Sequence, residues 1–535
     1  MTLASGNIKM IQYAAQKIVK SHDVMMSGKN TDLVKALQSL KRLQNETSSP
    51  VLRGQSILGA TQTKTLVQNG FLEPVIKGWF IASSPAHAGT TVTWYASFWH
   101  FIAAYCSHRF GEEWCLTPEE SLLIHSGINT IPQQVIVRVR KGSNTVQALP
   151  HQTSILNITA SLPSRIEREA TYGLHVYPLA EALLRSSAAF YANHATEARA
   201  CLYAIQDDAA LANAVHNSGG EAYAGRLIGA LESVGRRDVA DSIRRILKEE
   251  GRRIDVVNPF AQEFAPVQLP QTSPVALRLR LLWAEFRPRV QAVLPPLAST
   301  TNSLRPIDDV LREIDARSID DSYHSLSIEG YKVSEDLIHR IQSGEWNPQS
   351  DAHDHDQRNA LAAAGYYRAF RKVRETVAQI LNGADAGATL ANAIADWHRE
   401  LFMPCVEAGI LDAHDLAGYR RGQVYIAGSR YTPPPAAALA DAMDAFLDLL
   451  RSEPDDRVRA ILGHFFFVYI HPYADGNGRT ARFIMNAALV AGGGHWLVIP
   501  ITSRDRYMAS LESASTANRI EDFATFLTSL TSSRR

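Results

Sequence analysis

The chain has few cysteines, no long apolar run and no net charge. Its four cysteines among 535 residues form neither a CxxC motif nor a metal-ligand spacing with histidine. This spacing excludes a disulfide framework and favours scattered reduced thiols. No apolar run approaches the roughly 18 residues of a membrane span, and the first twenty residues lack a signal-peptide core. We therefore expect a cytoplasmic protein with no membrane partner, although an effector delivered by a specialised secretion system would look the same.

The charges balance over the whole chain but not along it. Lys and Arg together number 54, as do Asp and Glu, and the hydrophobic content of 46% is ordinary for a globular protein. Residues 1–80 instead hold ten basic residues against four acidic ones, an excess of six positive charges. This excess indicates an anionic partner such as double-stranded DNA. At about 150 residues per domain, the length predicts three or four domains.

The most informative run of side chains lies near the C-terminal end. It reads His471-Pro-Tyr-Ala-Asp475-Gly476-Asn477-Gly478-Arg479-Thr480-Ala481-Arg482. Residues 458–470 before it and 479–489 after it have the apolar periodicity of helices. The run is therefore predicted to be a loop that leads into a helix N-terminus. Free backbone N–H groups and the positive end of the helix dipole at such a terminus bind anions.

The polar side chains of this run suit a nucleotide-phosphate site. Arg479 and Arg482 are planar donors that can bind phosphate oxygens in pairs. Asp475 offers a hard oxygen ligand to Mg²⁺. His471 titrates near neutrality and is placed for a general base. The alternative is a glycine-rich turn between two core helices, although so many specific residues rarely coincide in such a turn.

The run resembles the Fic family motif H-x-F-x-D/E-G-N-G-R-x-x-R and departs from it only at Tyr473, where the family has phenylalanine. The resemblance implies transfer of AMP from Mg-ATP to a Ser, Thr or Tyr hydroxyl of a target protein. It also implies that His471 is the base and that residues 475–482 bind the nucleotide, with Asp475 as the metal ligand. Another nucleotide or a phosphocholine donor is compatible with the same motif.

A second similarity to the Fic family lies near residues 320–330. The segment from Ser325 to Gly330 fits the inhibitory-helix motif S/T-x-x-x-E-G/N. The similarity implies autoinhibition by Glu329, which would compete with the γ-phosphate for Arg482. An ordinary helix that ends in glycine has the same pattern. In related proteins this glutamate also aligns a water, so removal of AMP is an alternative activity.

Residues 422–435 alternate apolar positions, contain a Gly-Ser turn and end in three prolines, which predicts a β-hairpin. The segment resembles the flap of Fic proteins. This resemblance implies pairing with the target backbone and contacts to the nucleotide from Val424, Tyr425, Ile426 and Ala427. An ordinary edge hairpin is the alternative. Tyr507 lies where family members have a tyrosine near the adenine.

Residues 1–85 predict helices followed by a hairpin. Two helices are expected within residues 8–45, then a short helix near Gln55–Leu58, a helix at Thr61–Gln68, and a hairpin closed at Lys77-Gly78. This order resembles the winged-helix domain of AbiEi-type antitoxin regulators. The resemblance implies DNA contacts from Gln62, Lys64 and Lys77. A winged helix that binds protein fits the same order.

The rest of the chain completes a mainly α fold. Residues 86–255 predict an α+β part and then a helical part, which also resemble AbiEi-type regulators. Residues 256–300 predict a proline-rich linker and a helix over Val275–Leu294. The similarity to Fic proteins covers residues 301–535 and implies an all-helical fold with a small β-hairpin flap. A DNA-binding regulator whose Fic domain modifies itself or a cognate partner is the alternative to a dedicated transferase, and a homo-oligomer is compatible with either.

Overall fold

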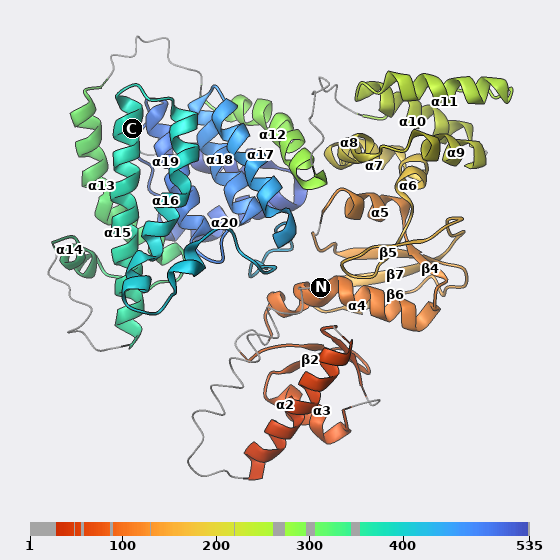
Figure 1. Cartoon of the computed structure of the whole chain (residues 1–535), viewed down its shortest axis with the longest axis horizontal. Coiled ribbons are helices and arrows are strands. Elements are labelled where there is room, and N and C mark those ends of the chain that lie inside the picture. Colours follow the sequence, from red (N-terminus) through yellow and green to blue (C-terminus); the bar gives the residue numbers. More distant parts are fainter. Residues whose placement is uncertain are drawn as a thin grey trace. The chain divides into compact units, whose positions relative to one another are not determined.

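The protein forms two compact units. A computed structural model describes residues 28–47, 49–54, 58–85, 89–128, 130–218, 220–260, 273–295, 305–343 and 354–532. Unit 1 comprises Met1–Pro274 and Gly422–Thr432, and unit 2 comprises Val275–Arg421 and Pro433–Arg535. The described residues are mainly helical (Figure 1), as the sequence predicts. No described helix is both long and apolar enough to cross a bilayer.

Unit 1 begins with two helices and a three-stranded antiparallel sheet. In chain order these elements are α2 (Gly28–Thr47), β1 (Val51–Arg53), α3 (Ala60–Gln68), β2 (Leu72–Ile76) and β3 (Trp79–Ala82). The sheet order is β1-β3-β2, and the predicted turn at Lys77-Gly78 joins β2 to β3. Leu40, Leu66 and Phe71 share the core of these elements. The predicted helix before residue 28 lies outside the described residues, as does most of the predicted helix near Gln55–Leu58.

A four-stranded mixed sheet and two helices follow. These elements are α4 (Thr91–Phe110), β4 (Trp114–Leu116), α5 (Pro118–His125), β5 (Gln134–Val139), β6 (Val146–Leu149) and β7 (Thr153–Thr159). The strand order is β4-β5-β7-β6, with β5 and β7 parallel. Val135, Val137 and Val139 are fully buried, because alternate residues of β5 face the core. A short antiparallel pair, β8 (Glu167–Arg168) and β9 (His175–Val176), comes next.

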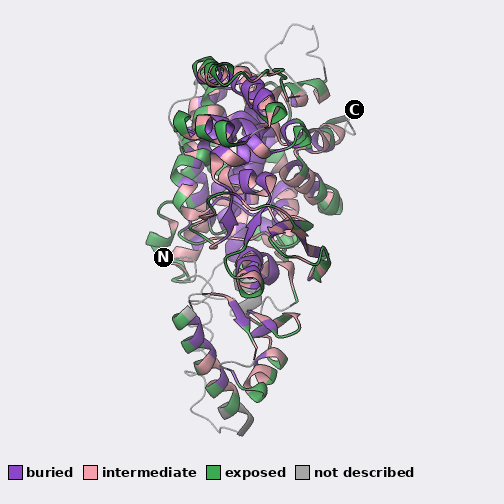
Figure 2. Cartoon of the chain, turned by 90° about the vertical axis from the view of Figure 1, so that its right-hand side faces the viewer, coloured by how far each residue is buried: buried purple, intermediate pink, exposed green. Residues whose placement is uncertain are grey.

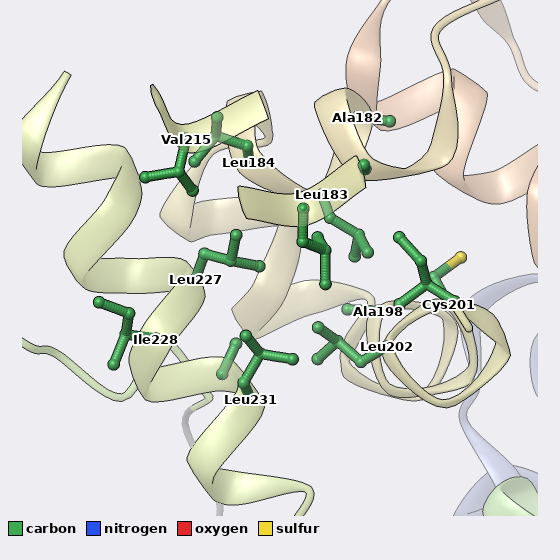
Figure 3. Close-up of a cluster of buried hydrophobic side chains, with 14 of the residues drawn as sticks. Ala182, Leu183, Leu184, Ala198, Cys201, Leu202, Val215, Leu227, Ile228 and Leu231 are labelled. Atoms are coloured by element: carbon green, nitrogen blue, oxygen red, sulfur yellow. The ribbon is translucent and has the colours of Figure 1, made fainter. Parts of the chain in front are cut away.

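The remainder of the N-terminal segment of unit 1 is helical, as predicted. Its helices are α6 (Leu179–Arg185), α7 (Ala188–Asn193), α8 (Ala195–Ala204), α9 (Asp208–Ser218), α10 (Glu221–Ser233) and α11 (Arg237–Glu249). Their apolar faces meet in one core, where Leu183, Leu202 and Leu231 are fully buried (Figure 3). Burial of such aliphatic side chains stabilises the unit by about 1.5–3 kcal/mol for each one.

Unit 2 consists almost entirely of helices. They are α12 (Pro274–Val293), α13 (Ile307–Ile328), α14 (Glu335–Ser343), α15 (Asp354–Leu381), α16 (Ala386–Glu407), α17 (Leu439–Ser452), α18 (Asp456–Ile470), α19 (Asn477–Ala491), α20 (Arg504–Ala517) and α21 (Ile520–Ser532). Three short 3-10 helices are η1 (Ala413–Leu416), η2 (Ala436–Ala438) and η3 (Ile501–Ser503). The predicted helix over Val275–Leu294 is confirmed as α12, whose Leu281, Leu282 and Phe286 are buried, and Phe286 contacts Phe465 of α18.

Helices α18 and α19 form the interior of unit 2. Their residues are buried on nearly every face. Surface helices instead carry both buried and exposed residues (Figure 2). Helix α16 lies close to α15 because Gly365 has no side chain. A Cβ added to this glycine would lie 2.0 Å from the carbonyl oxygen of Leu401. This close packing fixes α16, which contributes to the candidate site.

The predicted β-hairpin flap is wrong. Residues 422–435 are all described, and they contain a turn at Ala427-Gly428 but no strand. The reason is that backbone groups of this segment bond outside it. The N–H of Gly428 donates to Thr91 Oγ1 at 2.9 Å, and the carbonyl of Arg430 accepts the N–H of Ile131 at 2.8 Å.

Candidate active site

The run 471–482 comprises the short loop that joins α18 to α19 and the first residues of α19. His471 ends α18 with φ 52°, and Gly476 precedes α19 with φ 84°, a conformation that glycine adopts without strain. The buried Asn477 closes the loop, because its amide accepts from the N–H of Tyr473 at 3.0 Å and donates to the Tyr473 carbonyl at 2.8 Å. Asn477 therefore shapes the loop with its side chain.

His471 has the tautomer and charge of a general base. Its Nδ1–H donates to the carbonyl of Val468 at 3.2 Å, which leaves Nε2 as the acceptor. Burial lowers the pKa of His471 to about 4, so the ring is neutral near pH 7. Arg420 fixes the backbone there, with Nε donating to the His471 carbonyl at 2.8 Å and Nη2 to the Pro434 carbonyl at 2.5 Å.

Asp475 presents a carboxylate at the surface of the loop. Its side chain is 58% exposed, and Oδ1 accepts the N–H of Gly476 at 2.6 Å. His398 of α16 packs against the loop and bonds to its backbone. Its ring stacks on Tyr473 at a centroid distance of 3.5 Å, and its Nε2 donates to the Asp475 carbonyl at 3.0 Å. An exposed carboxylate on a supported backbone is suited to a hard cation.

Arg482 is buried and bonded to the C-terminal end of α13. Its Nε donates to Ser325 Oγ at 2.8 Å, and its Nη2 donates to the Ser325 carbonyl at 3.1 Å and to Glu329 Oε1 at 2.8 Å. The Arg482 side chain is 3% exposed and that of Glu329 is 29% exposed. Burial by itself would lower the pKa of Arg482, but the Glu329 carboxylate raises it, so the guanidinium stays charged. The predicted pairing of Glu329 with Arg482 is present, and Ser325 of the same motif also bonds to Arg482.

The Glu329 carboxylate lies against the first turn of α19. A Cβ added to Gly478 would lie only 2.3 Å from Glu329 Oε1. The carboxylate therefore lies where backbone N–H groups and the helix dipole favour an anion. Among the described residues, Arg482 Nη1 is buried and has no hydrogen-bond partner. A phosphate in place of the carboxylate would have a second donor available from the same guanidinium.

Tyr331 covers the other arginine of the loop. The guanidinium carbon of Arg479 lies 5.2 Å from the Tyr331 ring centroid and 5.1 Å from that of Phe402. The Tyr331 hydroxyl lies 3.4 Å from Asp475 Oδ2, and Arg479 Nη2 lies 3.3 Å from Asp475 Oδ1. Tyr331, His398 and Arg420 are site residues that the sequence reasoning missed. Tyr331 follows Gly330 of the inhibitory-helix motif and Arg420 lies two residues before the segment 422–435, whereas His398 lies near no motif residue in sequence.

Several residues that are predicted to contact the nucleotide are buried in this conformation. Tyr507 is fully buried, and its hydroxyl pairs with His464 Nε2 at 2.9 Å, so its ring offers no face to an adenine in this conformation. The side chains of Thr480 and Ala481 are also fully buried. The flap residues 424–427 belong to unit 1 by their contacts. The contacts predicted for all these residues stay predictions.

The predicted DNA-contacting residues differ in exposure. Lys64 and Lys77 are exposed, on α3 and in the β2–β3 turn. Gln62 is half-buried, and its Nε2 donates to Ser39 Oγ of α2 at 3.3 Å. Gln62 therefore joins the two helices in this conformation, whereas the two lysines remain available to a ligand.

Comparison with known proteins matches one segment of the chain to a family. Residues 389–489 match the Fic/DOC family model. The chain is 30% identical over 213 residues to proteins named protein adenylyltransferase Fic from Drosophila willistoni and Drosophila melanogaster. The match covers 39% of this chain and 39% of each relative. A solved structure of Caenorhabditis elegans Fic-1, residues 134–508, aligns over 65% of this chain and 96% of that one, with 18% identity and a TM-score of 0.36.

The matched region spans α16 to α19 and contains His398, His471, Asp475 and both loop arginines. The chain spans well under half of the length of the curated relatives that it matches. The chain thus contains a segment that matches the Fic/DOC family, and over that region it is similar to proteins named adenylyltransferases.

Proposed function

We propose that this protein is an autoinhibited adenylyltransferase that moves AMP from Mg-ATP to a Ser, Thr or Tyr hydroxyl of a target protein. The observation that carries the proposal is the 2.8 Å bond from Arg482 Nη2 to Glu329 Oε1, with the carboxylate lying against Gly478. The negative carboxylate of Glu329 occupies the position at the start of α19 where an anionic ligand would bind. The named adenylyltransferase relatives favour ATP as the source of that anion.

His471 performs the proton transfer in this proposal. Its Nε2 accepts the proton of the target hydroxyl while the hydroxyl oxygen forms a bond to the α-phosphorus. The bond between the α-phosphorus and the bridging oxygen of the β-phosphate breaks, and pyrophosphate leaves with that electron pair. The Nδ1–H bond to Val468 holds the ring in the required tautomer throughout.

The charged residues of the loop position the phosphates. Arg482 and the free N–H groups at the start of α19 would bind the outer phosphates once Glu329 withdraws. Asp475 would hold Mg²⁺, which supplies charge neutralisation to the phosphate oxygens. Positioning and fixed charge account for most of the catalysis in such transfers, so the protein needs no covalent intermediate.

The test is label incorporation from α-labelled ATP with Mg²⁺, with the protein alone and in a cell lysate. Glu329→Gly should label proteins strongly, the wild type weakly, and the double variant Glu329→Gly, His471→Ala not at all. Glu335→Gln is the matched control, because Glu335 is an exposed carboxylate at the start of α14. If the wild type labels proteins as strongly as Glu329→Gly, the proposed autoinhibition is wrong. If no variant labels any protein, the proposed transferase activity is wrong. Loss of label from pre-modified protein that requires Glu329 would instead support removal of AMP.

A second candidate function is DNA binding by the first part of unit 1. The observation that favours it is the order α2-β1-α3-β2-β3 with a β1-β3-β2 sheet, which is compatible with a winged helix. Lys64 lies exposed on α3, the helix that such domains place in the major groove, and Lys77 lies exposed in the wing turn. The resulting proposal is a transferase that also binds duplex DNA as a regulator.

Fluorescence anisotropy of the full chain with labelled duplex DNA tests this second candidate. We expect Lys64→Ala and Lys77→Ala each to weaken binding, and binding to fall steeply with salt because phosphate contacts release counterions. Lys141→Ala, an exposed lysine elsewhere in unit 1, is the control. Failure to bind any duplex at low salt would favour a winged helix that binds protein.

A further inference from the structure

The inward face of α13 carries a third polar residue besides the two that bond to Arg482. Asp321, Ser325 and Glu329 follow one another at intervals of four residues, so they lie on one face of the helix. Ser325 and Glu329 bond directly to Arg482. Asp321 is 3% exposed, and the transfer mechanism gives no role to its buried carboxylate.

Tyr366 of α15 links Asp321 to Ser325. Helices α13 and α15 lie side by side (Figure 1), and the Tyr366 hydroxyl donates to Asp321 Oδ2 at 2.6 Å. Burial and the Asp321 carboxylate raise the pKa of Tyr366, and a hydrogen bond from Ser325 opposes that rise. The fully buried ring of Tyr366 packs against Phe483 of α19, with the ring centroids 4.9 Å apart. Tyr366 is therefore fixed between α13 and the helix that carries Arg482.

The carboxylate of Asp321 sets the direction of these hydrogen bonds. A carboxylate only accepts, so Tyr366 donates its single hydroxyl hydrogen to Asp321. The Tyr366 oxygen is then the acceptor for the Ser325 hydroxyl. The Ser325 oxygen in turn accepts the Nε–H of Arg482 at 2.8 Å, and the Ser325 carbonyl accepts from Nη2 at 3.1 Å. Two bonds to one residue fix the plane of the guanidinium.

Asp321 is also the carboxylate that stays beside Arg482 when Glu329 withdraws. Burial raises the pKa of Asp321 to about 6, while a hydrogen bond from Tyr366 and the charge of Arg482 oppose the rise. The carboxylate is therefore charged near pH 7. A buried guanidinium that lost its only counter-charge would be costly, and Asp321 prevents that loss.

We propose that Asp321 and Tyr366 are positioning residues for the phosphate-binding arginine of the transferase. This inference rests on the transferase function proposed above. Through Ser325 the pair holds Arg482 so that Nη1 and Nη2 face the position that Glu329 vacates. Arg482 Nη1 has no hydrogen-bond partner among the described residues, so both nitrogens can serve one phosphate. Neither positioning residue contacts the nucleotide, and their effect is confined to the phosphate that Arg482 binds.

The experiment uses the full chain carrying Glu329→Gly, with Tyr366→Phe or Asp321→Asn added. Phenylalanine keeps the ring and removes the hydroxyl, and asparagine keeps the shape of aspartate and removes its charge. Tyr367→Phe and Asp320→Asn are the matched controls, because they make the same changes at half-buried neighbours on α15 and α13.

Two quantities are measured on each variant. Calorimetry gives the affinity for ATP and for ADP, which differ by the γ-phosphate. NMR of the chain labelled with ¹⁵N-arginine gives the rate at which the Arg482 Nε–H exchanges with water. The Arg482 resonance is assigned by its absence from the spectrum of Arg482→Lys.

We expect Tyr366→Phe and Asp321→Asn each to weaken ATP binding about fivefold, the effect of one net hydrogen bond, and to change ADP affinity less than about twofold. Exchange of the Arg482 Nε–H should become about fivefold faster in both variants, since the bond to Ser325 is loosened. Both controls should match the parent in affinity and in exchange.

Unchanged ATP affinity or unchanged Nε–H exchange would overturn the proposal. Equal loss of ATP and ADP affinity would also overturn it, because a general loosening of the fold would then explain the result. Tighter ATP binding by Asp321→Asn would show that Asp321 acts on Arg482 only through its charge and does not position it. If the Glu329→Gly parent binds no ATP, the transferase function fails, whereas the exchange rate still decides whether Asp321 and Tyr366 hold Arg482.

Discussion

Replacing Glu329 by glycine removes the carboxylate that bonds to Arg482 at 2.8 Å. A hydrogen bond to a charged group contributes about 1.5–3 kcal/mol, and the partial exposure of Glu329 favours the lower half of that range. A gain of about 2 kcal/mol for the competing anion corresponds to roughly 30-fold tighter binding of ATP. Arg482 keeps its two bonds to Ser325, so the variant should remain folded.

Isothermal titration calorimetry with ATP and with ADP separates the effect of the γ-phosphate from that of the rest of the nucleotide. If the carboxylate occupies the γ-phosphate position, ATP affinity rises about 30-fold and ADP affinity rises far less. Glu329→Gln should fall between the wild type and Glu329→Gly, since it removes the charge and keeps the shape. An equal rise in affinity for ATP and ADP would show that the carboxylate does not occupy the γ-phosphate position. No rise in affinity for either nucleotide would show that Glu329 does not compete with the nucleotide for Arg482.

Further predictions concern the base, the metal ligand and pH. His471→Ala in the Glu329→Gly background should abolish transfer and change ATP affinity less than about threefold by calorimetry, because the base contacts the target hydroxyl; loss of ATP binding would contradict this role. Asp475→Asn should remove the Mg²⁺ dependence of ATP binding, measured by titration with and without the metal, whereas retained dependence would place the metal on another residue. Because burial lowers the pKa of His471 to about 4, the neutral form of the base is present above that pH and is lost as pH falls through it. The transfer rate should therefore stay flat from pH 6 to 8 with respect to this group, and a midpoint near pH 6.5 would show that the histidine is not buried in the active state.

The sequence predicted the active loop because its chemistry is local. The run from His471 to Arg482 spans one helix end, one tight loop and one helix start, and each backbone feature follows from residues within it. Gly476 permits the positive φ before α19, and the apolar periodicity of residues 458–470 predicts the buried helix α18. In this run the local backbone preferences and the short-range hydrogen bonds favour the same conformation, so the residue pattern is enough to predict the loop.

The residues that support the loop come from distant parts of the chain and gave little signal. His398 and Tyr331 reach the loop from α16 and from the segment after α13, and their contacts depend on helix packing. Tyr507 shows the converse, because its position suggested an adenine contact and tertiary packing buries it beside His464. The flap was mispredicted for a related reason. Its alternating apolar residues favoured a hairpin, but backbone groups of the segment form hydrogen bonds with Thr91 and Ile131 instead of with each other.

The most direct test of the central claim compares ATP labelled at the α-phosphate with ATP labelled at the γ-phosphate. Both are incubated with the Glu329→Gly variant, Mg²⁺ and lysate, and the fate of each label is followed. If AMP is transferred, the α label becomes attached to protein hydroxyls and the γ label is recovered in pyrophosphate. Both results should be lost when His471→Ala is added to the variant. Attachment of the γ label to protein, or release of the γ label as orthophosphate without attachment of the α label, would contradict the account.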